Sequence, residues 1–138
     1  MCMIDNSDGY SEILSETDPL ARKPHKCHEC YRVIEPGERY HCESLLFEGR
    51  VSRHKTCQHC MVARGWLLAE CGGWLYSGVP DDIHEHAANG YGAYPMSVLR
   101  LAVGMRRKWR RRSGDLMPVP AMPPTTHDRD DAARKEQS

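Results

Sequence analysis

A chain of 138 residues, with 40% hydrophobic and 28% charged residues, fits one small globular domain with tails and contains no apolar run long enough to cross a membrane. A single Phe, beside three Trp and six Tyr, implies a modest core that needs a staple such as a metal ion or disulfides. The formal net charge of +0 conceals a segregation, because residues 1–20 carry five acids and no Lys or Arg, whereas residues 96–112 carry seven Lys or Arg and no acid.

The chain has seven cysteines, and their clusters are expected to bind metal rather than to form disulfides. The N-terminal stretch is acidic and lacks the apolar run of a signal peptide, which predicts a cytoplasmic protein. In a reducing compartment cysteine clusters bind metal more often than they form disulfides, and the odd number of cysteines also fits disulfide pairing poorly.

The first half of the chain predicts a flexible acidic arm followed by short strands. The arm covers residues 1–24 and ends at Pro24. Strands are predicted at residues 31–34, 39–47 and 50–54, with turns at residues 35–38 and 48–49, because Pro and Gly stand at suitable turn positions.

The second half predicts helices. Thr56 is the expected N-cap of a helix over residues 57–70, which ends at Gly72. A short helix is predicted from Pro80 to Asn89, with acids near the positive end of its dipole. A turn over residues 91–95, a helix over residues 96–112 and a disordered tail over residues 113–138 follow.

Two Cys-x2-Cys pairs are the strongest motif, and we expect them to hold one structural zinc ion. The pairs are Cys27 with Cys30 and Cys57 with Cys60, and 26 residues separate them. Zinc takes four sulfur or nitrogen ligands at tetrahedral corners, and each pair supplies two thiolates from one tight turn. The order of knuckle, hairpin and helix predicts a small α+β fold, a treble-clef-like zinc finger followed by two helices. The zinc-finger domain is expected over residues 25–95, and the basic helix over residues 96–112.

His54 is an alternative fourth ligand. Cys27, Cys30, His54 and Cys57 have the spacing of the first half of a LIM domain or of a PARP-type finger, and the local sequence from Lys26 to His41 resembles those families. Cys60 is favoured because it lies one helical turn after Cys57, and no second LIM module is present to use it.

Several other ligand-type residues are expected to have structural or minor roles. Cys42 and Cys71 are interpreted as small buried side chains, and Cys2 lies in the arm. A second metal site from Cys71, His84 and His86 is a weaker alternative. The remaining histidines near the cysteines are expected to face solvent or to surround the ligands: His25, His28, His41 and His59.

The region from about Lys23 to His86 resembles small zinc-finger proteins of bacteriophages and prophages. The resemblance rests on HKCHEC, IEPGERY, KTCQHC and a later Cys-Gly-Gly-Trp followed by Asp-Asp-Ile-His-Glu, and it covers roughly half of the chain. It implies the cytoplasm of a bacterial host and a role in regulation or host takeover.

An enzyme is not expected. Four cysteines would close the zinc shell, whereas a catalytic site keeps an open position. His84-Glu85-His86 lacks metalloprotease spacing, and no phosphate-binding loop or nucleophile elbow is present. We expect one Zn²⁺, no small-molecule substrate and no membrane partner.

The basic segment predicts a nucleic-acid contact through residues 100–112. Six of the seven residues from 106 to 112 are cationic, and Trp109 could stack on bases: the run is Arg106, Arg107, Lys108, Trp109, Arg110, Arg111 and Arg112. Its apolar half, residues 98–103, is expected to dock on the finger. The alternative function is binding to a host protein through an aromatic surface made of Trp66, Trp74, Tyr76, Tyr91 and Tyr94.

Overall fold

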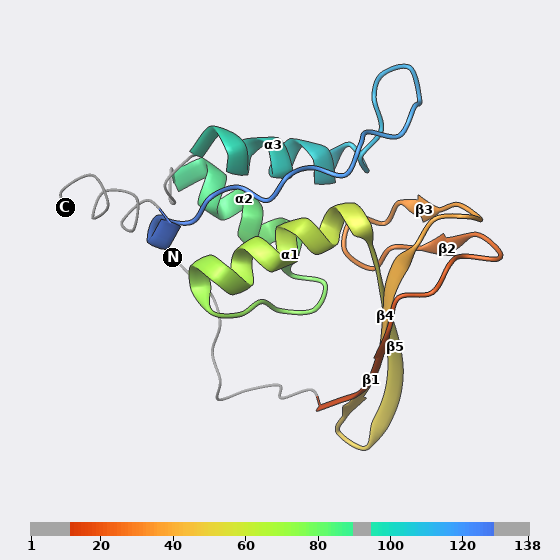
Figure 1. The fold of residues 1–138 in the computed structure, drawn as a ribbon. Coiled ribbons are helices and arrows are strands. Elements are labelled where there is room, and N and C mark those ends of the chain that lie inside the picture. The colour runs from red at the N-terminus through yellow and green to blue at the C-terminus, as the bar shows by residue number, and fades with distance from the viewer. Residues whose placement is uncertain (1–11, 90–94, 129–138) are drawn as a thin grey trace.

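The computed structural model describes residues 12–89 and 95–128 (Figure 1). Its strands precede its helices, so the chain is a small α+β protein with antiparallel strands, as predicted. The elements in chain order are β1 (Glu12–Thr17), β2 (His25–Lys26), β3 (Val33–Ile34), β4 (Tyr40–Phe47), β5 (Arg50–Cys57), α1 (Gln58–Cys71), α2 (Val79–Asn89) and α3 (Pro95–Arg106). The predicted turn over residues 91–95 falls mostly on residues 90–94, outside the described residues.

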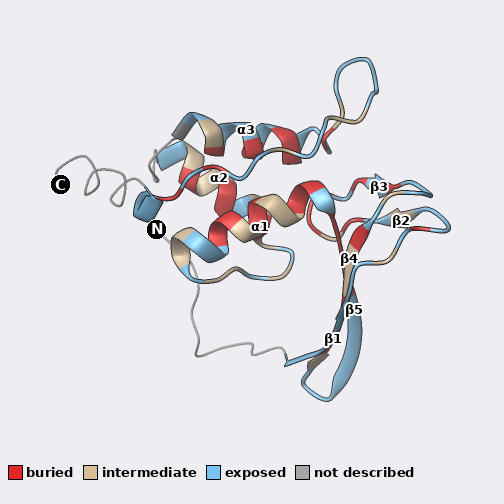
Figure 2. Cartoon of the chain, viewed as in Figure 1, coloured by how far each residue is buried: buried red, intermediate tan, exposed pale blue. Residues whose placement is uncertain are grey.

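The larger sheet has the order β1-β4-β5, with both pairs antiparallel. Phe47 pairs with Arg50 across a two-residue loop, in which Glu48 has φ 51° and Gly49 has φ 76°. Two successive residues at positive φ fit a type I′ hairpin turn, whose twist matches that of the strands. Figure 2 shows the far end of this hairpin exposed, while the end that carries Tyr40 and Cys57 is buried beside the helices.

Part of the expected flexible arm forms strand β1. Glu12 pairs with Leu46 and Thr17 pairs with Cys42 on the edge of β4. Further along, the amide of Ala21 donates to the carbonyl oxygen of Glu38 at 2.8 Å. Every residue of β1 is exposed, so the strand is held by backbone hydrogen bonds to β4 and has no apolar alternation that a sequence could show. Residues 1–11 lie outside the described residues.

The helices bury their apolar faces against one another and form most of the core (Figure 2). Helix α1 begins one residue later than predicted, because Thr56 belongs to β5 and Cys57 is the N-cap. It ends at Cys71 and is capped by Gly72, whose φ of 83° lets its amide donate to the carbonyl oxygen of Leu68. The core side chains of the three helices include Trp66, Leu67, Val79, Ile83, Val98, Leu101, Ala102 and Met105.

Helix α3 ends at Arg106, six residues before the predicted end. The amide of Trp109 donates to the carbonyl oxygen of Gly104 at 2.7 Å, and the amide of Lys108 donates to that of Met105 at 3.0 Å. This pair of bonds, with Lys108 at φ 54°, is a Schellman cap that reverses the chain. The cap folds Trp109 back over Gly104, so the basic run lies mostly outside the helix.

The C-terminal segment, predicted to be disordered, is ordered in its described part. Residues 113–128 run back along α1 and α3 (Figure 1). The amide of Met117 donates to the carbonyl oxygen of Trp109 at 2.7 Å, and the Trp66 indole donates to that of Pro124 at 3.4 Å. The Thr126 amide donates to the Glu70 carboxylate at 2.8 Å. These partners are far apart in sequence and leave no local periodicity, which explains why composition suggested disorder. Residues 129–138 lie outside the described residues.

Two helical glycines give opposite predictions for substitution by alanine. A Cβ atom at Gly104 would lie 2.2 Å from Cζ3 of Trp109, whereas one at Gly65 would lie 3.6 Å from Sδ of Met122, an ordinary contact. Gly104→Ala should therefore lower the free energy of unfolding by about 1–3 kcal/mol through overpacking. Gly65→Ala should raise it by up to about 1 kcal/mol through helix propensity. Urea titration of both variants measures the difference, and equal stabilities would contradict the close packing of Trp109 on α3.

Candidate metal centre

Four cysteines gather into one buried cluster. Cys27 and Cys30 lie on the turn between β2 and β3, Cys57 is the last residue of β5, and Cys60 lies on the first turn of α1. Their four Sγ atoms all lie within 4.8 Å of one another, and no side chain is more than 5% exposed. The structure thus brings together the two predicted pairs, and this set could hold one metal ion such as zinc.

The first pair is shaped by a tight backbone turn. The amide of Cys27 donates to the carbonyl oxygen of Arg32 at 2.8 Å, and the amide of Tyr31 donates to that of Cys27 at 3.0 Å. Tyr31 has φ 63°, the left-handed conformation that closes this turn. Two amides, those of Glu29 and Cys57, each lie 3.4 Å from Cys27 Sγ and point donors at a sulfur that would carry negative charge.

The second pair is brought to the first by strand β5. The His28 amide donates to the Lys55 carbonyl oxygen at 2.8 Å, and the Lys55 amide donates to Nδ1 of His28 at 3.0 Å. These two hydrogen bonds hold the turn that carries Cys27 and Cys30 against β5, just before Cys57. Helix α1 starts directly after it, so Cys60 returns to the cluster after one helical turn.

The thiols perturb one another strongly. Hydrogen bonds from the other three thiols, that of Cys27 first, lower the pKa of Cys57 far below its usual range. The pKa of Cys30 is raised, first by its hydrogen bond with Cys27, and that of Cys60 is raised by its hydrogen bonds with all three. The pKa of Cys27 is also lowered, first by its hydrogen bond with Cys30, so two of the four thiols lose their protons more readily than usual and two hold them more tightly. A divalent cation would replace those protons and let all four sulfurs ionise.

His54, the alternative ligand, is engaged elsewhere. Its Nε2 lies 2.9 Å from Oε2 of Glu29, and its ring packs edge-on against Tyr76 with ring centroids 4.8 Å apart. The buried Glu29 carboxylate also accepts the amides of Ser77, at 3.0 Å, and Val79, at 3.3 Å, at the start of α2. Glu29 thus links the cysteine turn to a helix, a role that no pattern in the sequence indicated.

A cation and an imidazole lie directly beside the cluster. The Arg32 side chain is 2% exposed, and it donates to the Glu38 carboxylate at 3.0 Å. Burial alone would lower the pKa of Arg32, but the bond to Glu38 and the charge on Cys57 raise it. His59 is buried, and its Nε2 lies 2.6 Å from the Met117 carbonyl oxygen, which can only accept. The proton of His59 therefore sits on Nε2, and Nδ1 faces Arg32 Nη2 at 3.5 Å.

Trp109 is buried against the cluster rather than exposed for stacking. It is 2% exposed, and its indole N–H lies 3.3 Å from Cys60 Sγ. Its ring packs on His59, with ring centroids 5.3 Å apart. The expectation that Trp109 stacks on bases is therefore not supported by its position. The six cations around it are exposed or half-buried, and within the described residues none forms an ion pair: Arg106, Arg107, Lys108, Arg110, Arg111 and Arg112.

One member of the aromatic surface suggested by the sequence is not available for binding. Trp66 is fully buried in the core. Trp74 and Tyr76 are half-buried and pack against each other, with ring centroids 4.3 Å apart, and the Arg64 guanidinium lies 3.5 Å above the Trp74 ring. Tyr91 and Tyr94 lie outside the described residues.

Cys71 is disulfide-bonded, contrary to the expectation from the sequence, and Cys71, His84 and His86 do not gather around a common point. Cys71 Sγ lies 3.2 Å from Nε2 of His86, but His84 stands two positions earlier on α2 and so points to the opposite side. Another group that the described residues bring together is His41 between Glu16 and Glu43. Nε2 of His41 lies 3.2 Å from Glu43, whose carboxylate is also held by Arg64 and Tyr76.

Comparison with protein-family models, curated proteins and solved structures finds no match to this chain. The resemblance to phage-type zinc-finger proteins therefore stays a prediction. None of the described helices combines the length and apolar character that spanning a bilayer requires.

Cysteine variants test which residues hold the metal. Cys60→Ser should lower metal affinity by more than about tenfold, since the loss of outer contacts alone costs that much. His54→Ala should leave metal stoichiometry unchanged, because His54 binds Glu29 instead. Elemental analysis after dialysis against a weak chelator measures both.

Cys42→Ser is the matched control, because Cys42 is a half-buried free thiol of β4 that is not among the clustered cysteines. It should keep its metal. Loss of metal from His54→Ala with retention in Cys60→Ser would reverse the assignment of the fourth ligand.

Proposed function

We propose that this chain is a zinc-stabilised binding protein that contacts nucleic acid through its cationic turn, defined as residues 106–112. The zinc part rests on the buried cluster of four sulfurs, the donor set that structural zinc prefers. The order of knuckle, hairpin β4–β5 and helix α1 supports a treble-clef finger.

The ion would act as a cross-link rather than as a catalyst. Four cysteines would occupy all tetrahedral positions and leave none open for water or substrate. Zinc supplies most of the folding free energy of such small sites. The surrounding residues would stabilise the site further, because amide, indole and guanidinium groups around the sulfurs offset the negative charge of the cluster.

The observation that carries the nucleic-acid part is the contact between Trp109 and Cys60. The indole N–H lies 3.3 Å from the Cys60 sulfur, so the residue at the middle of the cationic turn is anchored in the metal centre. The cations on both sides of this anchor are unpaired within the described residues and extend toward solvent. In Figure 1 the loop after α3 projects from the body of the protein. Such a fixed array of cations suits a phosphate backbone, whose binding releases counterions.

The salt dependence of binding tests this proposal. With about four phosphate contacts on a duplex, the slope of log affinity against log salt should be roughly −3 to −4. Arg111→Gln with Arg112→Gln should flatten the slope by roughly 2 and weaken all sequences alike. Fluorescence anisotropy with labelled 20-base-pair duplexes over a salt series provides the measurement.

Arg50→Gln with Arg53→Gln is the matched control, since both residues are exposed on β5 at the far end of the sheet. It removes the same charge and should leave the slope unchanged. Equal losses in both double variants would show a diffuse charge effect, and no shift with any nucleic acid at low salt would end the nucleic-acid proposal.

The second candidate is binding to a host protein, and an apolar groove favours it. Exposed Met96, Leu99 and Val103 of α3 line a groove of about 470 Å³ together with Met117 and Pro118. Apolar association loses little affinity with salt, which separates the two candidates. A regulatory or host-takeover role of phage type belongs to both proposals and rests on the sequence resemblance alone.

A further inference from the structure

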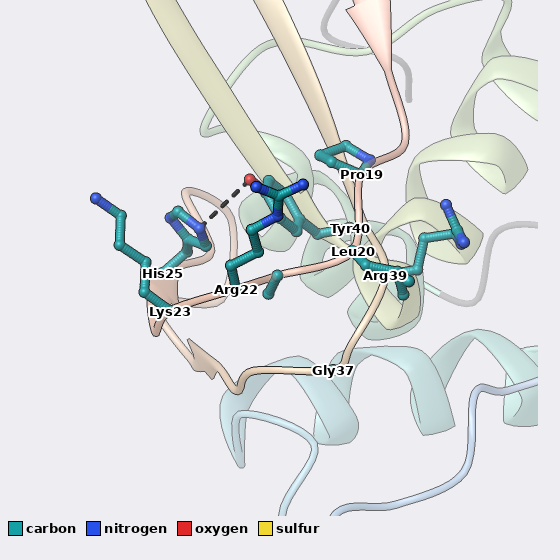
Figure 3. A pocket seen from close by; sticks show the side chains of 9 residues that line it. Pro19, Leu20, Arg22, Lys23, His25, Gly37, Arg39 and Tyr40 are labelled. Atoms are coloured by element: carbon teal, nitrogen blue, oxygen red, sulfur yellow. Dashed lines mark hydrogen bonds between the residues drawn. The ribbon is translucent and has the colours of Figure 1, made fainter.

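A second cationic region lies on the other side of the cysteine turn. A pocket of about 870 Å³ opens where residues 19–25 cross the start of β4 (Figure 3). Arg22, Lys23 and Arg39 line it and no acidic residue does. Within the described part of the chain none of the three forms an ion pair, whereas the nearby Arg32 is paired with Glu38. The pocket therefore holds uncompensated positive charge.

The three cations differ in where they point. In Figure 3, Arg22 extends toward the part of the pocket where the Tyr40 hydroxyl lies, whereas Lys23 extends outward past His25. Arg39 extends to the other side, and its Nη1 donates to the Asp18 carbonyl oxygen. Arg22 and Lys23 are both exposed, so their charged groups can reach a ligand.

A hydrogen-bond chain sets the direction of the Tyr40 hydroxyl. Lys55 Nζ lies 3.0 Å from Nδ1 of His25, and an ammonium group can only donate, so Nδ1 accepts. The imidazole proton of His25 is then on Nε2, which lies 3.4 Å from the Tyr40 oxygen and donates to it. His25 is the one partner that the described residues give the Tyr40 hydroxyl, so its own proton is available to a ligand in the pocket, although Tyr40 is only 7% exposed.

The geometry points to a phosphate-binding site in this pocket, with the Arg22 guanidinium, the Lys23 ammonium and the Tyr40 hydroxyl as donors. The polar side chains that line the pocket offer a ligand hydrogen-bond donors, and none of them is a carboxylate. This lining suits an anion with several acceptor oxygens. A nucleic-acid strand is the source of the phosphate, an assignment that rests on the function proposed above. His28 and Lys55 clamp the neighbouring turn to β5, so the pocket and the cationic turn are both fixed to the same cysteine cluster.

Binding of a labelled single-stranded 12-mer tests the source of the phosphate. Arg22→Gln with Lys23→Gln should weaken binding by roughly fivefold at low salt and flatten the salt slope by roughly 1.4, the value for two contacts on a single strand. Arg50→Gln with Arg53→Gln, which removes equal charge at the far end of the sheet, should leave both unchanged. Equal behaviour of the two double variants would overturn the assignment to a strand.

Titration with inorganic phosphate tests the pocket itself, whether or not nucleic acid binds. Saturable shifts of the amide NMR signals of residues 20–23 and 37–40 are expected, and acetate at equal ionic strength should produce none. Tyr40→Phe, which keeps the ring, should weaken phosphate binding by roughly tenfold. Absence of saturable shifts would overturn the pocket. If phosphate produces saturable shifts but the 12-mer does not bind, the pocket is a site for a small phosphate ligand. The proposed nucleic-acid function would then be wrong.

Discussion

The proximity of four cysteine sulfurs is the constraint on which the rest of the structure depends. Two thiolates about 4 Å apart repel by about 4 kcal/mol at the effective dielectric constant of a protein surface, and four of them form six such pairs. The chain can hold the Sγ atoms within 4.8 Å only if protons or a cation neutralise them. Donors around the cluster reduce this repulsion further: two amides, the Trp109 indole and the Arg32 guanidinium.

The residues that serve the cluster also connect the parts of the fold. Glu29, between the first two cysteines, accepts amides at the start of α2. His59, between the second two, bonds Arg32 on one side and the C-terminal segment through Met117 on the other. Trp109 joins the end of α3 to Cys60. A binding surface on the cationic turn would therefore be held rigid by its link to the cysteine cluster.

The cysteine pairs, the hairpin and the helices could be predicted because each depends on local spacing. Cys-x2-Cys encodes its own turn, Glu48-Gly49 encodes a hairpin, and the helix over residues 57–70 differs from α1 by one residue at each end. The prediction failed where long-range contacts override local preference. Composition suggested a helix through residue 112, but the fit of the Trp109 ring on Gly104 ends α3 at Arg106.

The same limit explains the residues that sequence reasoning missed. Glu29 and Arg32 are charged residues in a loop-rich region, where exposure is the usual expectation, and only the assembled cluster gives them buried partners. Residues 12–17 lack an apolar alternation because β1 pairs on an edge through its backbone. The composition of residues 113–128 predicts disorder, whereas the contacts that order them are made with residues 58 positions earlier, such as Trp66 and His59.

The position of Trp109 bears on how long a metal ion would stay bound. The Trp109 indole covers the Cys60 sulfur, and the segment that follows Trp109 covers the His59 imidazole. Both of these covering segments come after the four cysteines in the sequence, so the ribosome makes them last. Metal could load while this cover is still missing. Afterwards, chelators and oxidants would reach Cys60 only when residues 109–128 swing open, so the exchange rate of the ion would follow that local opening rather than its equilibrium affinity.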